Sequence, residues 1–268
     1  MRETQFDFTS SEEKKSYVRT MFSDIAGRYD FLNHFLSFGL DYYWRRKAVS
    51  IIKNHCEVDS RWSIVDGQVE FDNLPSTIDY RQNPAPRILD IACGTGDLSF
   101  ELLKHIPNAR ITGIDLAKPM LDIFQQKINS RNVPITISEG DVEALAFADN
   151  TFDVVTIGFA TRNFSRLNIA FKEIARVLKP GGIFVNLELS KPRGVPMKHL
   201  YAFYSKQILP IIGKIVSKNS EAYNYLPDSI QRFPEREEIM KIFLEAGFSQ
   251  AEWQDLSAGI VTMHVGKK

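Results

Sequence analysis

Short apolar segments alternate with helix-like segments along the chain from residue 87 onward. The apolar segments are typical of buried strands and cover residues 87–91, 110–115, 135–138, 152–157 and 182–188. The helix-like segments carry apolar residues three and four apart and cover residues 98–105, 118–130 and 167–178. Because strands and helices that alternate at this spacing build parallel βαβ units, the pattern predicts a doubly wound, mainly parallel α/β sheet.

Two C-terminal strands are expected to complete this sheet. Residues 235–246 predict a helix that Gly247 ends, since glycine is the usual residue after a helix C-terminus. Apolar positions at 253–255 and 261–265 then predict a pair of strands. The expected sheet therefore has seven strands, and residues 87–268 form the core domain.

Segments with a different pattern flank and interrupt this core. Residues 1–56 are expected to form a helical lid or substrate region, because 11–54 combine helical spacing with many aromatic residues. Residues 57–86 are polar and contain several prolines, which predicts an insertion or a linker. A helical insertion is expected over 192–234, in which a helix is followed by a tyrosine-rich loop.

Composition narrows the class of protein. Lys plus Arg and Asp plus Glu both number 33, so no net charge attracts the chain to nucleic acid. The two cysteines, Cys56 and Cys93, favour a reducing compartment over a disulfide framework. The first residues lack the apolar segment of a signal peptide, and no apolar run approaches the roughly 20 residues of a membrane span. We therefore expect a cytoplasmic protein, with peripheral contact at the inner face of the membrane left open.

A glycine-rich turn follows the first expected strand and reads Asp90-Ile91-Ala92-Cys93-Gly94-Thr95-Gly96-Asp97. Glycine has no Cβ, so the backbone of such a turn can approach a bound cofactor closely. Turns of this kind bind dinucleotides, phosphates and nucleosides, and some bind nothing. The turn alone therefore does not decide between a cofactor site and ordinary packing.

Acidic residues after the next two strands narrow the choice. Asp115 ends the second strand, where a carboxylate accepts hydrogen bonds from ribose hydroxyls, and Asp141 with Val142 follows the third strand, where an adenine ring would lie. The third glycine of a dinucleotide motif is missing, and Asp97 would repel a pyrophosphate. The series favours S-adenosylmethionine, whose cationic aminoacyl part suits Asp90. The expected cofactor-binding residues are Asp90, Gly94, Thr95, Gly96, Asp115, Asp141, Val142 and Gly158.

Further segments carry a family signature. Tyr29-Asp30-Phe31-Leu32-Asn33-His34-Phe35-Leu36-Ser37-Phe38-Gly39 precedes Trp44-Arg45-Arg46, and Tyr223-Asn224-Tyr225-Leu226-Pro227-Asp228-Ser229-Ile230 follows much later. Between them lie Arg162-Asn163 and Arg176-Val177-Leu178-Lys179-Pro180-Gly181-Gly182. With these segments the chain resembles the ubiquinone/menaquinone biosynthesis C-methyltransferase family over nearly its full length. The Arg176–Gly182 segment is shared by many methyltransferases, whereas the first and third segments are much more specific.

The resemblance implies a class I, Rossmann-like methyltransferase that uses S-adenosylmethionine to methylate a ring carbon of a polyprenylated quinol, for example demethylmenaquinol to menaquinol. It places Arg162 and Asn163 at the carboxyl edge of the sheet, where Arg162 would stabilise the quinol oxyanion and Asn163 would orient the quinol. Asp30 is the candidate final proton acceptor, and Tyr29 and Asn33 are expected to contact the substrate. No metal or nucleic acid is expected, and a membrane surface or a homodimer partner is left open.

Some readings stay open. Asp41 stands where the family often has His, and Gly158 where it usually has Ser. The alternative for Arg162 is a salt bridge to a neighbouring helix, and for Cys93 the favoured interpretation is a small packing residue. A methyltransferase for another lipid or phenol and a non-catalytic scaffold are the competing functions, and the residues do not decide between naphthoquinol and benzoquinol.

Overall fold

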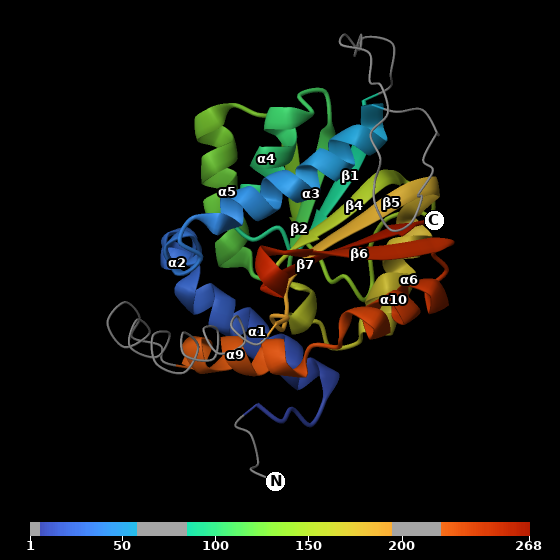
Figure 1. The fold of residues 1–268 in the computed structure, drawn as a ribbon. Helices are drawn as coiled ribbons and strands as arrows, with labels where there is room; N and C mark the ends of the chain where they lie inside the picture. The colour runs from blue at the N-terminus through green and yellow to red at the C-terminus, as the bar shows by residue number, and fades with distance from the viewer. Residues whose placement is uncertain (1–5, 58–84, 195–220) are drawn as a thin grey trace.

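The computed structural model describes residues 6–57, 85–194 and 221–268, and a seven-stranded sheet crosses its centre (Figure 1). The strand order is β3-β2-β1-β4-β5-β7-β6. Strands β3 to β5 in this order run parallel, and β7 runs antiparallel to both of its neighbours. The doubly wound, mainly parallel sheet of seven strands is thereby confirmed. The strands are β1 (Arg87–Ile91), β2 (Arg110–Asp115), β3 (Ile135–Glu139), β4 (Phe152–Gly158), β5 (Leu178–Leu189), β6 (Gln250–Leu256) and β7 (Val261–Lys267).

Helices cover both faces of the sheet (Figure 1). One face carries α3 (Leu40–Glu57), α4 (Asp97–His105) and α5 (Lys118–Arg131), and the other carries α6 (Leu167–Val177) and α10 (Arg236–Glu245). The remaining elements lie near the carboxyl ends of the parallel strands. They are α1 (Ser11–Ile25), η1 (Ala26–Arg28), α2 (Tyr29–Leu36), η2 (Thr161–Asn163), α9 (Glu221–Arg232) and η4 (Ser257–Gly259).

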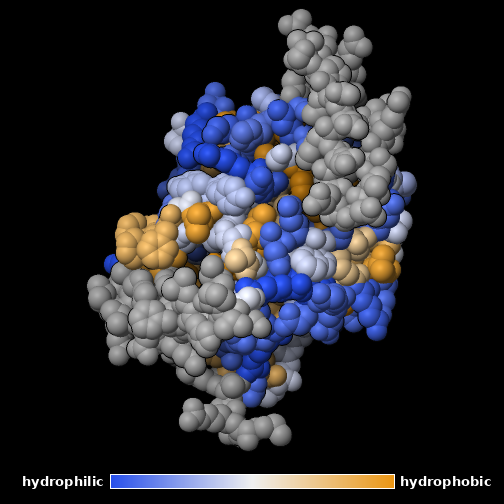
Figure 2. All heavy atoms as spheres, viewed as in Figure 1, coloured by the Kyte–Doolittle hydropathy of each residue, from blue (hydrophilic) through white to orange (hydrophobic). Residues whose placement is uncertain are grey.

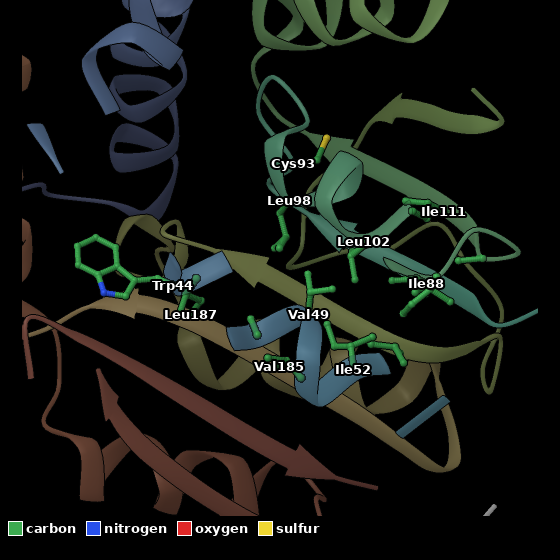
Figure 3. Close-up of a cluster of buried hydrophobic side chains, with 14 of the residues drawn as sticks. Trp44, Val49, Ile52, Ile88, Cys93, Leu98, Leu102, Ile111, Val185 and Leu187 are labelled. Atoms are coloured by element: carbon green, nitrogen blue, oxygen red, sulfur yellow. The ribbon is translucent and has the colours of Figure 1, made fainter. Parts of the chain in front are cut away.

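Alternation along the central strands produces two hydrophobic cores. Ile88 points into the core beneath α3 and α4, whereas its neighbour Leu89 points into the core beneath α6 and α10. In the first core, Val49 of α3 and Leu102 of α4 meet above the strands, as Figure 3 shows. Each fully buried side chain of this size contributes about 1.5–3 kcal/mol. The two cores fix the strand ends that form the site.

The helical regions differ from the sequence prediction in two places. The helical segment expected over 11–54 is divided, because Phe38 and Gly39 adopt positive φ angles of 53° and 75° and turn the chain between α2 and α3. The prediction of a tyrosine-rich loop was wrong, since its residues form α9 with Pro227 inside the helix. Tyr225 and Ile230 of α9 are buried, and this packing outweighs the cost of the proline.

Other expectations about the flanking segments stay predictions. The insertion expected at 57–86 and the helix expected at 197–216 lie largely outside the described residues. The boundaries 1–56, 57–86 and 192–234 are therefore untested. Gly247, in contrast, has a φ of 105° just after α10, as a helix C-terminal glycine should.

Candidate active site

The glycine turn lies at the carboxyl end of β1, which pairs with β2 on one side and β4 on the other. Ligands of open α/β sheets bind at such a point, where the strand order changes direction. A Cβ on Gly96 would lie 2.1 Å from Cε2 of Phe124, and φ there is 92°, so only glycine fits. Cys93 packs against Gly113, and burial raises the pKa of its thiol. These contacts identify Cys93 as a buried packing residue and Gly96 as the closest approach of the turn to α5.

Asp115 holds the glycine turn in place. Its Oδ2 accepts a hydrogen bond from the Gly94 amide at 2.8 Å, and its Oδ1 accepts one from the Ala117 amide at 2.8 Å. Burial raises the pKa of this carboxyl, and the backbone amides oppose that shift because they stabilise the ionised form. Each carboxylate oxygen has a second lone pair, so Asp115 can still accept hydrogen bonds from a ligand.

A first cavity of about 760 Å³, part of it open to solvent, lies in front of this turn. It brings together residues that are far apart in the chain, and seven of the expected site residues line it. They are Tyr29, Gly94, Asp115, Asp141, Val142, Gly158 and Asn163. Lys15 of α1 closes the cavity, because its Nζ lies 2.6 Å from Oδ2 of Asp141 and 2.8 Å from Oε2 of Glu143.

A second cavity of about 1140 Å³, also partly open, adjoins the first. Its lining is mostly apolar and comes from α1, α2, α3, α9, the last residue of β5 and the residues after β4 and η4. Phe22, Tyr29 and Phe159 line both cavities and so form a shared wall. Burial raises the pKa of Tyr29, and a hydrogen bond with Asn33, which lines the second cavity, opposes the shift.

Arg162 supplies a buried positive charge to the second cavity. Its Nη1 donates to Oε1 of Glu188 at 2.6 Å and to the carbonyl of Phe159, and its backbone amide donates to Oε2 of Glu188 at 3.0 Å. Burial lowers the pKa of Arg162, but Glu188 outweighs this effect and the pKa lies above its ordinary value. Nε of Arg162 has no hydrogen-bond partner within the described parts of the chain. The salt-bridge partner is thus a strand residue, and the guanidinium keeps a donor to spare.

The structure separates two of the expected catalytic residues from Arg162. Asp30 lines neither cavity, because its Oδ2 lies 2.6 Å from Nζ of Lys127 and its Oδ1 accepts a hydrogen bond from Thr95. Asn163 is buried at the first cavity, and its Oδ1 has no partner among the residues described. Neither residue therefore faces the second cavity beside Arg162.

Three expected cofactor residues support the turn from behind. Asp90 is buried, its Oδ2 accepts a hydrogen bond from Ser99 at 2.6 Å, and its Oδ1 has no partner in the described segments. Burial raises the pKa of Asp90 to about 7. Thr95 joins the turn to α2, and Gly96 begins α4. None of these three is among the residues that line the first cavity.

Sequence reasoning missed a buried ion-pair network beside the second cavity. Arg45 pairs with Asp41, and its Nη2 lies 3.3 Å from Oδ2 of Asp97. His34 lies 2.7 Å from Asp41, so His34, Asp41 and Asp97 stand close together as potential metal ligands. Arg45 and Lys127, however, already supply two positive charges to the two carboxylates. Glu188 was also missed, although a lone charge at the end of an apolar strand was a usable signal. The sequence gives no signal for Lys15, because Asp141 and Glu143, the carboxylates that it contacts at the cavity, lie more than 120 residues away.

Comparison with known proteins gives matches along nearly the whole chain. The model of the ubiE/COQ5 methyltransferase family matches residues 9–268. A demethylmenaquinone methyltransferase from Porphyromonas gingivalis is 38% identical over 258 residues, which cover 95% of this chain and 94% of the relative. A ubiquinone/menaquinone biosynthesis C-methyltransferase from Geotalea daltonii is 40% identical over 259 residues, which cover 96% and 98%.

Solved methyltransferases share the fold. A methyltransferase solved with the Haloferax volcanii Trm112 methyltransferase activator has a TM-score of 0.59 at 16% identity and covers 93% of this chain and 96% of its own. A SAM-dependent methyltransferase from Thermotoga maritima has a TM-score of 0.55 at 16% identity, with coverage of 93% and 99%. At this level of identity the likeness concerns the fold alone.

Proposed function

This chain belongs to the ubiE/COQ5 methyltransferase family, and from that premise we propose that it transfers the methyl group of S-adenosylmethionine to a ring carbon of a polyprenylated quinol, converting demethylmenaquinol to menaquinol. The observation that carries the proposal is the pair of adjoining cavities with Phe22, Tyr29 and Phe159 as their shared wall. A donor in the first cavity and an acceptor in the second would meet at this wall. Relatives named demethylmenaquinone methyltransferase favour the naphthoquinol over the benzoquinol.

The residues of the first cavity fit the donor. Asp115 has lone pairs left for the ribose hydroxyls, and Asp141 with Val142 would hold the adenine. The unpartnered Oδ1 of Asn163 is an acceptor suited to the cationic aminoacyl part. When bound, S-adenosylmethionine supplies a strongly electrophilic methyl group. The protein's main task is then to position the acceptor carbon.

Arg162 would stabilise the negative charge that develops on the acceptor. Loss of the quinol hydroxyl proton pushes electron density onto the adjacent ring carbon, which takes the methyl group and then loses its own hydrogen as a proton. The guanidinium of Arg162 is a fixed cation that would stabilise the oxygen of the ionised quinol. Among the described residues its Nε has no hydrogen-bond partner, so it is a donor left for the substrate. Because Asp30 is held by Lys127 and Thr95, water in the second cavity is the better proton acceptor.

Contact with a membrane belongs to the same proposal. No helix in the described part of the chain is long and apolar enough to cross a bilayer. A polyprenylated acceptor resides in the membrane, so the enzyme has to meet it at the surface. We place that contact at the inner face of the membrane.

The decisive experiment incubates the purified protein with isotope-labelled S-adenosylmethionine and either a demethylnaphthoquinol or a demethylbenzoquinol. We expect label on a ring carbon of the naphthoquinol. Binding of the donor in calorimetry without methylation of either ring would point to a different phenolic or lipid acceptor. Absence of donor binding would favour a scaffold without catalysis and would overturn the proposal.

A further inference from the structure

Large hydrophobic side chains are concentrated at one place on the surface. Of the seven that are exposed in the described residues, six lie between positions 31 and 43. We name this group the aromatic patch, and a hydrophobic area lies at the position of α2 in the space-filling view (Figure 2). Such a patch is costly in water and marks an interaction surface. Its members are Phe31, Phe35, Phe38, Leu40, Tyr42 and Tyr43.

Two members of the aromatic patch, Phe31 and Phe35, lie on the outer side of α2, whose inner side lines the second cavity. Phe31 and Phe35 are one helical turn apart, and their rings stack with centroids 5.7 Å apart. Leu32, Asn33 and Leu36, on the other side of the same helix, line the cavity. The thickness of one helix thus separates the acceptor cavity from Phe31 and Phe35.

Basic side chains border the aromatic patch. Arg46 and Lys47 lie one turn beyond Tyr42 and Tyr43 on α3 and are exposed, and Nε of Arg46 lies 3.3 Å from Oε1 of Glu101. Nζ of Lys47 lies 5.7 Å from the centroid of the Tyr43 ring. Aromatic rings beside cationic side chains suit the interface of a membrane, where rings enter the boundary of the acyl chains and cations meet anionic headgroups.

We propose that the aromatic patch docks the enzyme on an anionic lipid bilayer, with the three phenylalanines inserted and the tyrosines and Lys47 at the level of the headgroups. This placement turns the wall of the second cavity toward the membrane, where a prenyl tail can stay in lipid while the ring enters the cavity. The proposal rests on the proposed quinol substrate. It adds the surface, the orientation and the class of lipid.

The test measures binding to vesicles of phosphatidylcholine with phosphatidylglycerol, by sedimentation of the full chain. The variant F31S/F35S/F38N removes the exposed rings, and asparagine suits the positive φ of position 38. The matched control is L244S, because Leu244 is the remaining exposed large hydrophobic residue of the described chain and lies on α10. We expect the triple variant to bind at least tenfold more weakly, the control to bind within twofold of the parent, and vesicles without phosphatidylglycerol to bind the parent several-fold more weakly.

Equal vesicle binding by the parent and the triple variant would overturn the proposal. So would a dimeric parent whose triple variant is monomeric yet binds vesicles normally, because the patch would then join two copies. The triple variant should also methylate a short-tailed, water-soluble quinol at the parent rate and lose activity on a long-tailed quinol in vesicles. If the parent methylates neither quinol, the proposed function fails, whereas the vesicle measurement still decides the role of the patch.

Discussion

The two cavities are built in opposite ways, although they share a wall. The first cavity collects the ends of β1, β2, β3 and β4, so its residues follow their strands in chain order. The second is assembled from helices at both ends of the chain around Arg162 and Phe159. Its geometry depends on contacts such as the 2.9 Å hydrogen bond from the Trp44 indole to Ser257, which joins residues 213 positions apart.

Because of this difference, we expect the affinity for the donor and the rate of methyl transfer to depend on different cavities. Changes in the first cavity should alter the binding of the donor, because the carboxylates that would hold it are fixed by backbone amides. Changes in the second should alter the rate of methyl transfer, because the buried charge of Arg162 that would face the acceptor lies there. Two substitutions, of Arg162 and of Lys15, test this division directly, and two others test the packing and the charge of the glycine turn.

Removal of the Arg162 guanidinium should give the largest effect. We expect Arg162→Ala to lower kcat by about 10²–10³-fold, the loss typical of one oxyanion donor, while donor affinity changes less than threefold. Single-turnover kinetics and calorimetry measure the two quantities.

Arg162→Ala also leaves Glu188 buried without its partner, which by itself destabilises a fold. The double variant R162Q/E188Q is the control, since it removes both charges together. It should unfold near the parent temperature and remain as slow as Arg162→Ala. A double variant with parent turnover would show that the guanidinium is structural.

Gly96→Ala should destabilise the folded state by about 2–4 kcal/mol, from overpacking against Phe124 and from the positive φ. Gly94→Ala is the matched substitution in the same turn, because its Cβ would meet only Cε1 of Tyr29 at 3.8 Å. It should cost about 1 kcal/mol for its φ of 54°. Urea unfolding measures both, and equal losses would contradict the tight packing at position 96.

Asp90 should make stability depend on pH. Its folded pKa of about 7 lies above the unfolded value near 3.9, so between these limits the folded state binds more protons. The free energy of unfolding should therefore fall as the pH rises from about 4 to 7, by at most about 1.4 kcal/mol per pH unit. Asp90→Asn should remove this part of the slope in urea unfolding series, and parallel curves for the two proteins would speak against it.

Lys15→Met should have the smallest effect. Loss of the ammonium leaves Asp141 and Glu143 without one partner, so the cover that α1 forms over the first cavity weakens. We expect donor affinity to fall about three- to tenfold, in the range of a partly buried ion pair, with kcat unchanged. Lys118→Met, which removes an exposed pair with Asp122, serves as the control in calorimetry and should leave affinity unchanged.

The same difference explains what could be predicted from the sequence. Gly94, Asp115 and Asp141 could be predicted to lie together, and they line one cavity, because parallel strands bring their carboxyl ends to one edge in chain order. Asp30 and Asn163 were assigned to the acceptor from their positions in the family motifs. In the structure Asp30 contacts Lys127, and Asn163 of η2 lines the first cavity.

Side-chain pairs between residues far apart in the chain could not be predicted from local sequence patterns. Glu188 and Lys15 owe their roles to partners 26 and more than 120 positions away, which no spacing rule reaches. The helix α9 was missed because Pro227 is a strong local signal against helix, whereas its buried face depends on contact with α1 and η2.

The wall between the two cavities also has a consequence for the stereochemistry of methyl transfer. Within the described residues, neither cavity is lined by a thiol or an imidazole that could carry the methyl group between donor and acceptor. The methyl group would then pass directly from the donor to the acceptor in one displacement, with the acceptor carbon attacking opposite the departing sulfur. A methyl group made chiral with hydrogen, deuterium and tritium would arrive on the ring with inverted configuration.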